Sequence, residues 1–411
     1  MSAITRRGVF HRLSPGGDAE GESNEPTVLF VSAPVGVGGS TRSMANILTY
    51  MDGRCRRVLA GPPDGRFHDL VHQLHAADTY LPIISSERPR PPRRALSALK
   101  LALFARRNRD AITAMHANGL KEMSLSIAAA LVSGVRLVVW VHEFNLPPSV
   151  IKLGWLWRRL LRRVDVQFAA VSTLARDVVA DAGLVDADDV AIVPNPIDPA
   201  DVLAPPDAKA EAAEDIAEDS RLRVAFLGSP FVYKGFQYLP ELIRLTTAAA
   251  PVRWLVFSRQ TDDSLPAVWD ELRAMTESET HPVSIEGKLT DVGLAYARCD
   301  IVVVPSDLES FCRVAAEAML NGLPVVGSDL PPVRALLGDD EQAGLLFPVG
   351  DVEAGAKAIV RLATDVDLRA TMGIEGRRRA LVFSPDVVGA QFSGLYRLGY
   401  SPVPAKAKAK A

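Results

Sequence analysis

Short apolar segments rich in β-branched residues recur along this chain, and stretches long enough for a helix separate most of them. Continuous runs of this length predict strands that are buried on both faces of a parallel sheet. They fall into two series, and in each series the first segment leads into a glycine-bearing turn. Strands that alternate with helices favour a doubly wound α/β sheet. The sequence therefore predicts two Rossmann-like domains in tandem.

The same pattern predicts the strands and the domain limits. The expected strands are residues 27–32, 56–61, 114–119, 136–142, 165–172 and 189–195 in the first series, and 222–228, 252–258, 281–287, 300–306, 323–329 and 344–349 in the second. A stretch rich in Asp, Ala, Glu and Pro between the two series is typical of a linker. The predicted divisions are a disordered tail at 1–25, an N-terminal domain at 26–200, a linker at 201–221, a C-terminal domain at 222–385, a terminal helix at 386–404 with an amphipathic part from Phe392 to Tyr400, and a repetitive tail at 405–411.

Composition excludes several classes of protein. The chain has 411 residues, of which 48% are hydrophobic and 23% charged, which is typical of globular domains with large cores. Acidic and basic residues nearly balance, so the net charge argues neither for nor against a nucleic-acid partner, and none is expected. Three widely spaced cysteines favour a reducing compartment and form no zinc pattern. The N-terminus lacks the apolar core of a secretory signal, and the apolar stretch from Met123 to Val141 is interrupted by Ser133-Gly134 and Arg136. That stretch is expected to form a helix, a turn and a strand, and the protein is expected to be cytoplasmic.

Two glutamates follow one of the strands predicted in the second series. Glu309 comes shortly after the strand that ends near Val304, and Glu317 lies eight positions further on, about two helical turns. Ligands of open α/β sheets bind at the carboxyl ends of the strands. Carboxylates placed there suit a polyhydroxyl ligand, since each oxygen can accept a hydrogen bond from a sugar hydroxyl. The alternative is a helix start that carries two solvated acids.

A candidate anion site lies at the start of the second series. Gly228 ends its first strand, and Lys234 and Gly235 precede a predicted helix. Backbone amides at a helix start together with a lysine can bind a diphosphate. A lysine in this position is also commonly a solvated surface residue, so the signal is weak without the two glutamates of the same domain.

These residues carry a resemblance to a known family. The segments GSPFVYKG, GKLTDVGLAYARCDIVVVPS, ESFCRVAAEAMLNGLPVVGSD and AGLLFPVGD occur in the order found in retaining, nucleotide-sugar-dependent glycosyltransferases of the GT-B fold, in particular the large bacterial family with the E-x7-E motif. The similarity extends from about Thr27 to Tyr400. It implies two doubly wound domains that face each other across a cleft, with a C-terminal helix that crosses back to the N-terminal domain.

The resemblance also implies roles for individual residues. Glu309 would bind the hydroxyls of the donor sugar, Glu317 the ribose hydroxyls, and Lys234 the leaving diphosphate. His142, at the end of an N-domain strand, matches a histidine beside the transferred sugar. The other donor-binding positions that it implies are Gly38, Gly39, Gly228, Ser229, Lys288, Ser310, Phe311, Cys312 and Arg313.

The implied reaction is the transfer of a sugar from a nucleotide diphosphate sugar to an acceptor hydroxyl with retention of anomeric configuration. Positive charge develops on the sugar and negative charge on the diphosphate, so a cation and amide dipoles at the leaving group favour the transition state. The donor is a co-substrate, and no cofactor is expected. The acceptor could be a glycan, a lipid-linked sugar or a small molecule.

No metal is expected. The two D-x-D sequences, Asp186 to Asp188 and Asp365 to Asp367, match a metal motif of the other main glycosyltransferase fold. Both lie in polar, turn-like stretches, and we interpret them as solvated helix caps.

The chain departs from the family pattern in several places. The arginine usual after the first strand of the second domain is Ser229, and the glycine usual after Glu-x-Phe is Cys312. Arg259 and Arg313 are candidates to replace the missing arginine. Two alternatives to a transferase therefore stay open. One is a nucleotide-sugar epimerase of similar fold, and the other is a non-catalytic partner that binds a sugar nucleotide.

Two basic stretches could bring the N-terminal domain to a membrane. Residues 88–109 and 152–163 combine Lys and Arg with leucines, and the second also contains Trp155 and Trp157. Basic amphipathic helices with aromatic residues can bind an anionic membrane surface. The alternative is an ordinary domain helix with a solvated basic face.

Overall fold

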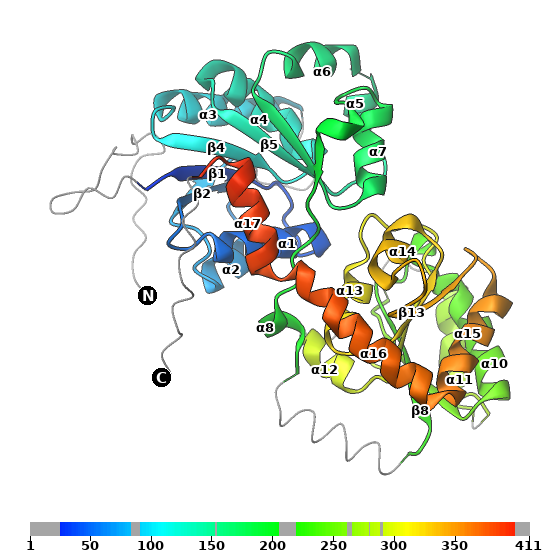
Figure 1. The fold of residues 1–411 in the computed structure, drawn as a ribbon. Helices are drawn as coiled ribbons and strands as arrows, with labels where there is room; N and C mark the ends of the chain where they lie inside the picture. The colour runs from blue at the N-terminus through cyan, green and yellow to red at the C-terminus, as the bar shows by residue number, and fades with distance from the viewer. Residues whose placement is uncertain are drawn as a thin grey trace. The chain divides into compact units, whose positions relative to one another are not determined.

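The structure, a computed structural model, describes residues 25–83, 91–152, 154–204, 219–260, 265–278, 280–287 and 291–398. These residues form two compact units (Figure 1). Unit 1 consists of the chain up to Val171, residues 175–194 and the chain from Pro385 onward, and unit 2 of residues 172–174 and 195–384. In the part of the chain described, no helix is both long and apolar enough to cross a membrane.

Unit 1 is built on a seven-stranded parallel sheet in the order β3-β2-β1-β4-β5-β6-β7. The strands are β1 (Thr27–Val31), β2 (Arg56–Gly61), β3 (Thr79–Pro82), β4 (Ile112–Ala117), β5 (Arg136–Val141), β6 (Val166–Ala170) and β7 (Val190–Ile192). Six of them were predicted from their apolar runs. The edge strand β3 was missed because it is short, half-exposed and contains a proline, so it lacks the continuous apolar signal.

The helices of unit 1 connect these strands, and one comes from the far end of the chain. They are α1 (Gly39–Tyr50), α2 (Arg66–Gln73), α3 (Pro91–Arg107), α4 (Leu120–Ser133), α5 (Pro148–Lys152), α6 (Gly154–Leu161), α7 (Thr173–Asp181), the short η1 (Ala187–Asp189) and α17 (Pro385–Leu395). The stretch from Met123 to Val141 folds as predicted: α4 ends at Gly134, whose left-handed backbone starts the turn into β5.

The C-terminal helix α17 packs against α1 of unit 1 (Figure 1). The two helices approach closely at Gly389, where a β-carbon would lie 2.1 Å from Cδ1 of Tyr50. Beyond the helix, the Tyr396 hydroxyl lies 2.6 Å from Nδ1 of the buried His116 on β4. The prediction of a helix that reaches Tyr400 was wrong in its limits. The helix ends at Leu395, Arg397 has a left-handed φ of 57°, and residues 399–411 lie outside those described.

Unit 2 is built on a six-stranded parallel sheet in the order β10-β9-β8-β11-β12-β13. The strands are β8 (Leu222–Leu227), β9 (Val252–Phe257), β10 (Val283–Ile285), β11 (Ile301–Val304), β12 (Val325–Ser328) and β13 (Gly344–Phe347), all of which were predicted. The helices are α8 (Pro199–Val202), η2 (Val232–Lys234), η3 (Phe236–Tyr238), α10 (Leu239–Ala249), α11 (Pro266–Thr276), α12 (Val292–Ala297), α13 (Arg313–Leu320), α14 (Pro331–Leu337), α15 (Val352–Thr364), α16 (Val366–Ala380) and η4 (Leu381–Phe383).

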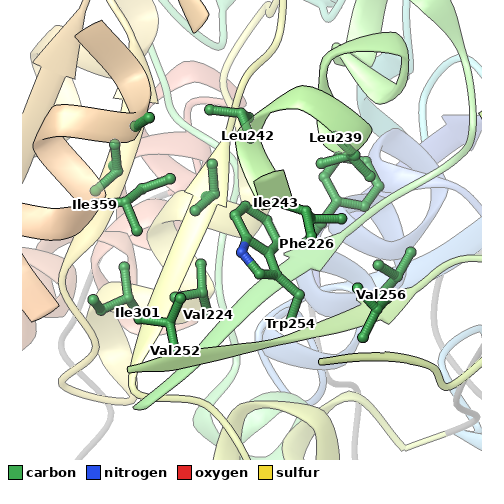
Figure 2. Close-up of a cluster of buried hydrophobic side chains, with 14 of the residues drawn as sticks. Val224, Phe226, Leu239, Leu242, Ile243, Val252, Trp254, Val256, Ile301 and Ile359 are labelled. Carbon is green, nitrogen blue, oxygen red and sulfur yellow. The ribbon is translucent and has the colours of Figure 1, made fainter. Parts of the chain in front are cut away.

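One face of this sheet is covered by a dense hydrophobic core (Figure 2). Trp254 of β9 lies at its centre, fully buried, and its Nε1 donates a hydrogen bond to Thr246 Oγ1 at 2.9 Å. Leu242 and Ile243 of α10 and Ile359 of α15 pack onto the strands from above. This close packing makes the sheet rigid. The loops at its strand ends therefore start from fixed positions.

Each sheet reverses its strand order once, and this reversal positions the candidate site. In unit 2 the reversal lies between β8 and β11, and in unit 1 between β1 and β4. Loops that leave the carboxyl ends of two such strands diverge to opposite sides and leave a crevice that binds ligands in open α/β folds. The predicted site residues lie on these loops: Lys234 follows β8, Glu309 follows β11, and His142 follows β5 beside the reversal in unit 1.

Candidate active site

The centre of the site in unit 2 is an ion pair between Lys234 and Glu309. Lys234 Nζ lies 2.8 Å and 2.9 Å from the two carboxylate oxygens of Glu309. Ser306 donates a hydrogen bond to the same carboxylate at 2.9 Å. Burial alone would lower the pKa of Lys234, but the carboxylate of Glu309 outweighs burial and holds the pKa of Lys234 above its usual value. Lys234 is therefore charged at neutral pH, and Glu309 is buried rather than solvated.

A close backbone approach brings these two residues together. Gly235, directly after Lys234, has a left-handed φ of 72°, and a β-carbon there would lie 1.8 Å from the carbonyl oxygen of Pro305. Next to it, the backbone amides of Asp307 and Leu308 donate to the carbonyl of Tyr233 at 3.0 Å and 3.3 Å. The loops after β8 and β11 are thus joined through their main chains, and the glycine is required for this contact.

The second glutamate of the motif is held separately. Glu317 lies in α13, and its carboxylate pairs with Arg313 at 3.0 Å and accepts a hydrogen bond from the Tyr296 hydroxyl at 3.0 Å. Burial and the neighbouring Glu317 carboxylate raise the pKa of Tyr296 well above its usual value, so the phenol stays a hydrogen-bond donor. Both glutamates are buried, and the alternative of two solvated acids is therefore wrong.

Cys312 lies between the two glutamates and is strained. It precedes α13 with φ 71°, a left-handed conformation that costs a residue other than glycine about 1–2 kcal/mol. Burial, and then the charge of Glu309, raise the pKa of its thiol well above the usual value, with a smaller contribution from Glu317. The resemblance implies glycine at this position, and the backbone of Cys312 has the left-handed conformation that glycine favours.

Ser229, which stands where the family resemblance implies an arginine, is exposed. Ser229 lies at the surface directly after Gly228, whose amide donates to Phe257 O at 3.2 Å. Arg313 is engaged elsewhere in unit 2, by Glu317 and by the carbonyl of Pro196 at 2.9 Å, and Arg259 is exposed at the end of β9. Ser310 and Phe311 lie between Glu309 and Cys312, with Phe311 buried against Phe383. Lys288 lies outside the described residues.

In unit 1, His142 is oriented by a residue that the sequence prediction missed. The amide side chain of Asn118, at the end of β4, lies with Oδ1 2.9 Å from His142 Nε2. The Asn118 Nδ2 group faces the Ser32 hydroxyl and the carbonyl of Ser40, at 3.3 Å and 3.4 Å. Asn118 therefore links the histidine to the turn that contains Gly38 and Gly39. Asn118 lies at the carboxyl end of the predicted strand 114–119, and a polar side chain in this position was a signal that could have identified it.

The glycine turn itself is open. Gly38 is the N-cap of α1, with φ −131°, and its amide donates to Thr41 Oγ1 at 2.7 Å. No atom lies within 4 Å of a β-carbon built on Gly38, and Gly38 and Gly39 are both exposed. Neither the backbone conformation nor the packing of the described residues requires glycine at position 38. A glycine there would allow a ligand to approach the backbone closely.

The two D-x-D sequences lie at helix starts. Asp365 accepts a hydrogen bond from the Leu368 amide at 2.9 Å and caps α16, and Asp186 precedes the short helix η1. Within the residues that are described, no group of three or more His, Cys, Asp or Glu side chains is arranged to hold a metal ion.

Comparison with known proteins relates both units to glycosyltransferases. Residues 37–201 match the family described as Glycosyltransferase Family 4, and residues 221–365 match Glycosyl transferases group 1. The D-inositol 3-phosphate glycosyltransferase of Xylanimonas cellulosilytica is 29% identical over 59% of this chain and 59% of its own length. The phosphatidyl-myo-inositol mannosyltransferase of Mycobacterium leprae is 34% identical over 31% of this chain and 34% of its own length. The chain thus spans at most about three fifths of the curated relatives it matches.

The fold is also that of solved structures. Anabaena HepE, crystallised in complex with UDP-glucose, superposes with a TM-score of 0.75 at 19% identity, covering 90% of this chain and 98% of HepE. At this identity the likeness supports the fold alone. The predicted fold class, two Rossmann-like sheets of the GT-B type, is confirmed.

Proposed function

The chain belongs to the glycosyltransferases of the GT-B type, and on that premise we propose that it transfers a sugar from a nucleoside diphosphate sugar to an acceptor hydroxyl, with retention of configuration and without a metal ion. The observation that carries the proposal is the ion pair between the half-buried Lys234 and the buried Glu309 at the strand-order reversal of unit 2. Its cation suits a diphosphate, and its carboxylate suits the hydroxyls of the attached sugar.

Binding of the donor would redistribute the charges of this pair. The diphosphate would take up the ammonium of Lys234 and the backbone amides at the start of α13, and Glu309 would turn its freed oxygens to the sugar hydroxyls. Glu317 would accept hydrogen bonds from the ribose, with Arg313 and Tyr296 keeping its carboxylate in place. In unit 1, His142 and the turn at Gly38 and Gly39 would act on the sugar and the phosphates.

Donor binding is expected to stabilise the protein measurably. A ligand at one hundred times its dissociation constant raises the free energy of unfolding by about 2.7 kcal/mol, a shift of several degrees in the unfolding midpoint. We expect such a shift with UDP-glucose or another member of a nucleotide-sugar panel, measured by differential scanning fluorimetry. Lys234→Met should reduce it, because the diphosphate loses its cation, whereas Lys357→Met, at an exposed lysine of α15, should not.

The same panel separates the alternatives. A transferase releases nucleoside diphosphate faster when an acceptor is present, whereas an epimerase converts the donor without one. A non-catalytic partner would show the thermal shift and no turnover with any acceptor. No shift with any nucleotide sugar would contradict the proposal itself.

We further propose that the acceptor is reached at an anionic membrane surface. In unit 1, Leu96, Leu99 and Leu103 form an exposed apolar stripe on α3. On α6, Trp155 is 64% exposed, and Arg158 and Arg159 beside it are also exposed. Exposed apolar side chains beside basic ones suit the boundary between headgroups and acyl chains.

Membrane binding is testable by sedimentation with vesicles. The protein is expected to co-sediment with phosphatidylglycerol vesicles at low salt and to be released as salt rises, since the basic groups are screened. Trp155→Ala should weaken binding about tenfold, which corresponds to about 1.4 kcal/mol of lost apolar contact. Ile374→Ala, at a residue of α16 that is 75% exposed, is the control. No binding to anionic vesicles at low salt would exclude this surface.

A further inference from the structure

Two carboxyl groups, one buried and one half-buried, lie next to the predicted site residues of unit 1. Glu122 is in the first turn of α4, after β4, and Glu143 follows His142 at the end of β5. Glu122 is 3% exposed. Neither side chain belongs to the roles proposed above, and burial of two acids at one place is costly unless they are neutralised or hydrogen-bonded.

The pair connects three loops through backbone amides. Glu122 Oε1 accepts a hydrogen bond from the Ala33 amide at 3.1 Å, at the start of the loop that leads to the glycine turn. Glu143 Oε1 accepts from the Leu120 amide at 2.8 Å, and its Oε2 from the amide of His142 at 3.1 Å. The loops after β1, β4 and β5 therefore meet at these two carboxyls.

The two carboxyls also lie close to the same backbone position, Gly119. A β-carbon built on Gly119 would lie 2.9 Å from Oε1 of Glu143 and 3.0 Å from Oε2 of Glu122. An oxygen of each group thus borders the same small space. Two carboxylates that border the same poorly solvated space repel each other when both are ionised, which favours retention of one proton.

The hydrogen bonds indicate which carboxyl keeps the proton. Burial raises the pKa of Glu143 above its usual value, but both of its oxygens accept from backbone amides of other residues, which opposes this effect and favours the ionised form. Burial, and then the charge of Glu143, raise the pKa of Glu122 to about 7. Among the described residues, two charged groups act on Glu122: Glu143 raises its pKa, and Lys121 lowers it by a smaller amount. The loop that leads to the glycine turn contributes only the amide of Ala33, which donates to Glu122.

We propose that Glu122 and Glu143 form a proton-sharing pair of positioning residues that holds His142 and the glycine turn in place, so that loss of the proton displaces both and lowers activity. The part about activity rests on the proposed function, whereas the shared proton does not. The pair touches no reacting atom: it acts through the amides of His142 and Ala33.

Two glutamine variants should behave differently. In Glu122→Gln, the amide oxygen can still accept from Ala33, and the NH2 group replaces the carboxyl proton that points to Glu143. In Glu143→Gln, one of the two oxygens that accept from Leu120 and His142 is lost. The first variant therefore imitates the protonated pair, and the second breaks the contact with His142.

The first experiment measures stability, which needs no substrate. Between pH 4.5, the ordinary pKa, and about pH 7, folded wild-type protein keeps a proton that the unfolded chain has lost, so its stability should fall as pH rises through this range. This fall should be absent in Glu122→Gln and present in the control Glu277→Gln, at an exposed glutamate. A side-chain 13C titration of labelled glutamates should show one carboxyl that titrates near pH 7 in the wild type and none in Glu122→Gln.

The second experiment measures kcat and KM for the donor across pH. Above pH 7 the wild-type kcat should fall about tenfold per pH unit, as for loss of one essential proton, while KM changes little. Glu122→Gln should keep its kcat over this range, and Glu143→Gln should have a low kcat at every pH. Equal effects of the two variants, or a titration near pH 4.5, would overturn the proposal. Absence of turnover in wild type would contradict the proposed function and leave the first experiment decisive for the pair.

Discussion

Replacing Glu309 by alanine is expected to lower kcat by about a thousandfold, measured as acceptor-dependent release of nucleoside diphosphate. The variant removes the carboxylate that would bind the sugar hydroxyls, and it also frees Lys234, which Glu309 holds at 2.8 Å and 2.9 Å. Ser306 loses its acceptor as well. We expect the free energy of unfolding to fall by about 1–3 kcal/mol, because a partly buried ammonium remains without its counter-ion.

Glu309→Gln separates catalysis from stability. Glutamine retains the size of the side chain and one oxygen that can accept from Lys234 or Ser306, so the stability should lie close to that of the wild type. The negative charge is lost, and kcat should still fall by at least about a hundredfold. Glu353→Ala, at an exposed acid of α15, serves as the surface control. Wild-type turnover in Glu309→Ala would show that this pair is not the catalytic centre.

The second large effect is expected from Gly235→Ala. The new β-carbon would lie 1.8 Å from the carbonyl oxygen of Pro305, which is backbone of the loop after β11 and cannot rotate away. The left-handed φ of 72° adds a further penalty. We expect a loss of more than about 4 kcal/mol in the free energy of unfolding, measured by urea denaturation, or failure to fold.

Gly287→Ala is the matched control for this clash. Gly287 belongs to the same unit and has a similar φ of 67°, but no atom of the described residues lies within 4 Å of a β-carbon built there. It should lose only about 1–2 kcal/mol, the cost of the left-handed backbone. Similar losses in the two variants would mean that the close approach of the two loops contributes little to stability.

The fold was largely predictable because its strands are buried on both faces. All six strands of unit 2 and six of the seven in unit 1 contain a short run that is mainly apolar, and their alternation with helices identified the architecture. The missed strand β3 is short and half-exposed, so its sequence lacks the run of apolar residues that marks a buried strand. The predicted end of α17 was wrong because amphipathic spacing does not show where the backbone leaves the helical conformation. Here the backbone is left-handed at Arg397.

The sequence by itself determined the chemistry that is available at the site. It identified Lys234, Glu309 and Glu317 as the groups that could meet a diphosphate and its sugars, from their places after predicted strands and from the family resemblance. Which groups pair with which was decided only by the tertiary structure: Lys234 with Glu309, Glu317 with Arg313 and Tyr296, and Glu122 with Glu143. The physical reason is that Lys234 and Glu309, like Glu122 and Glu143, follow different strands. The order of strands in the sheet, which brings β8 beside β11 and β4 beside β5, is not encoded in any local run of residues.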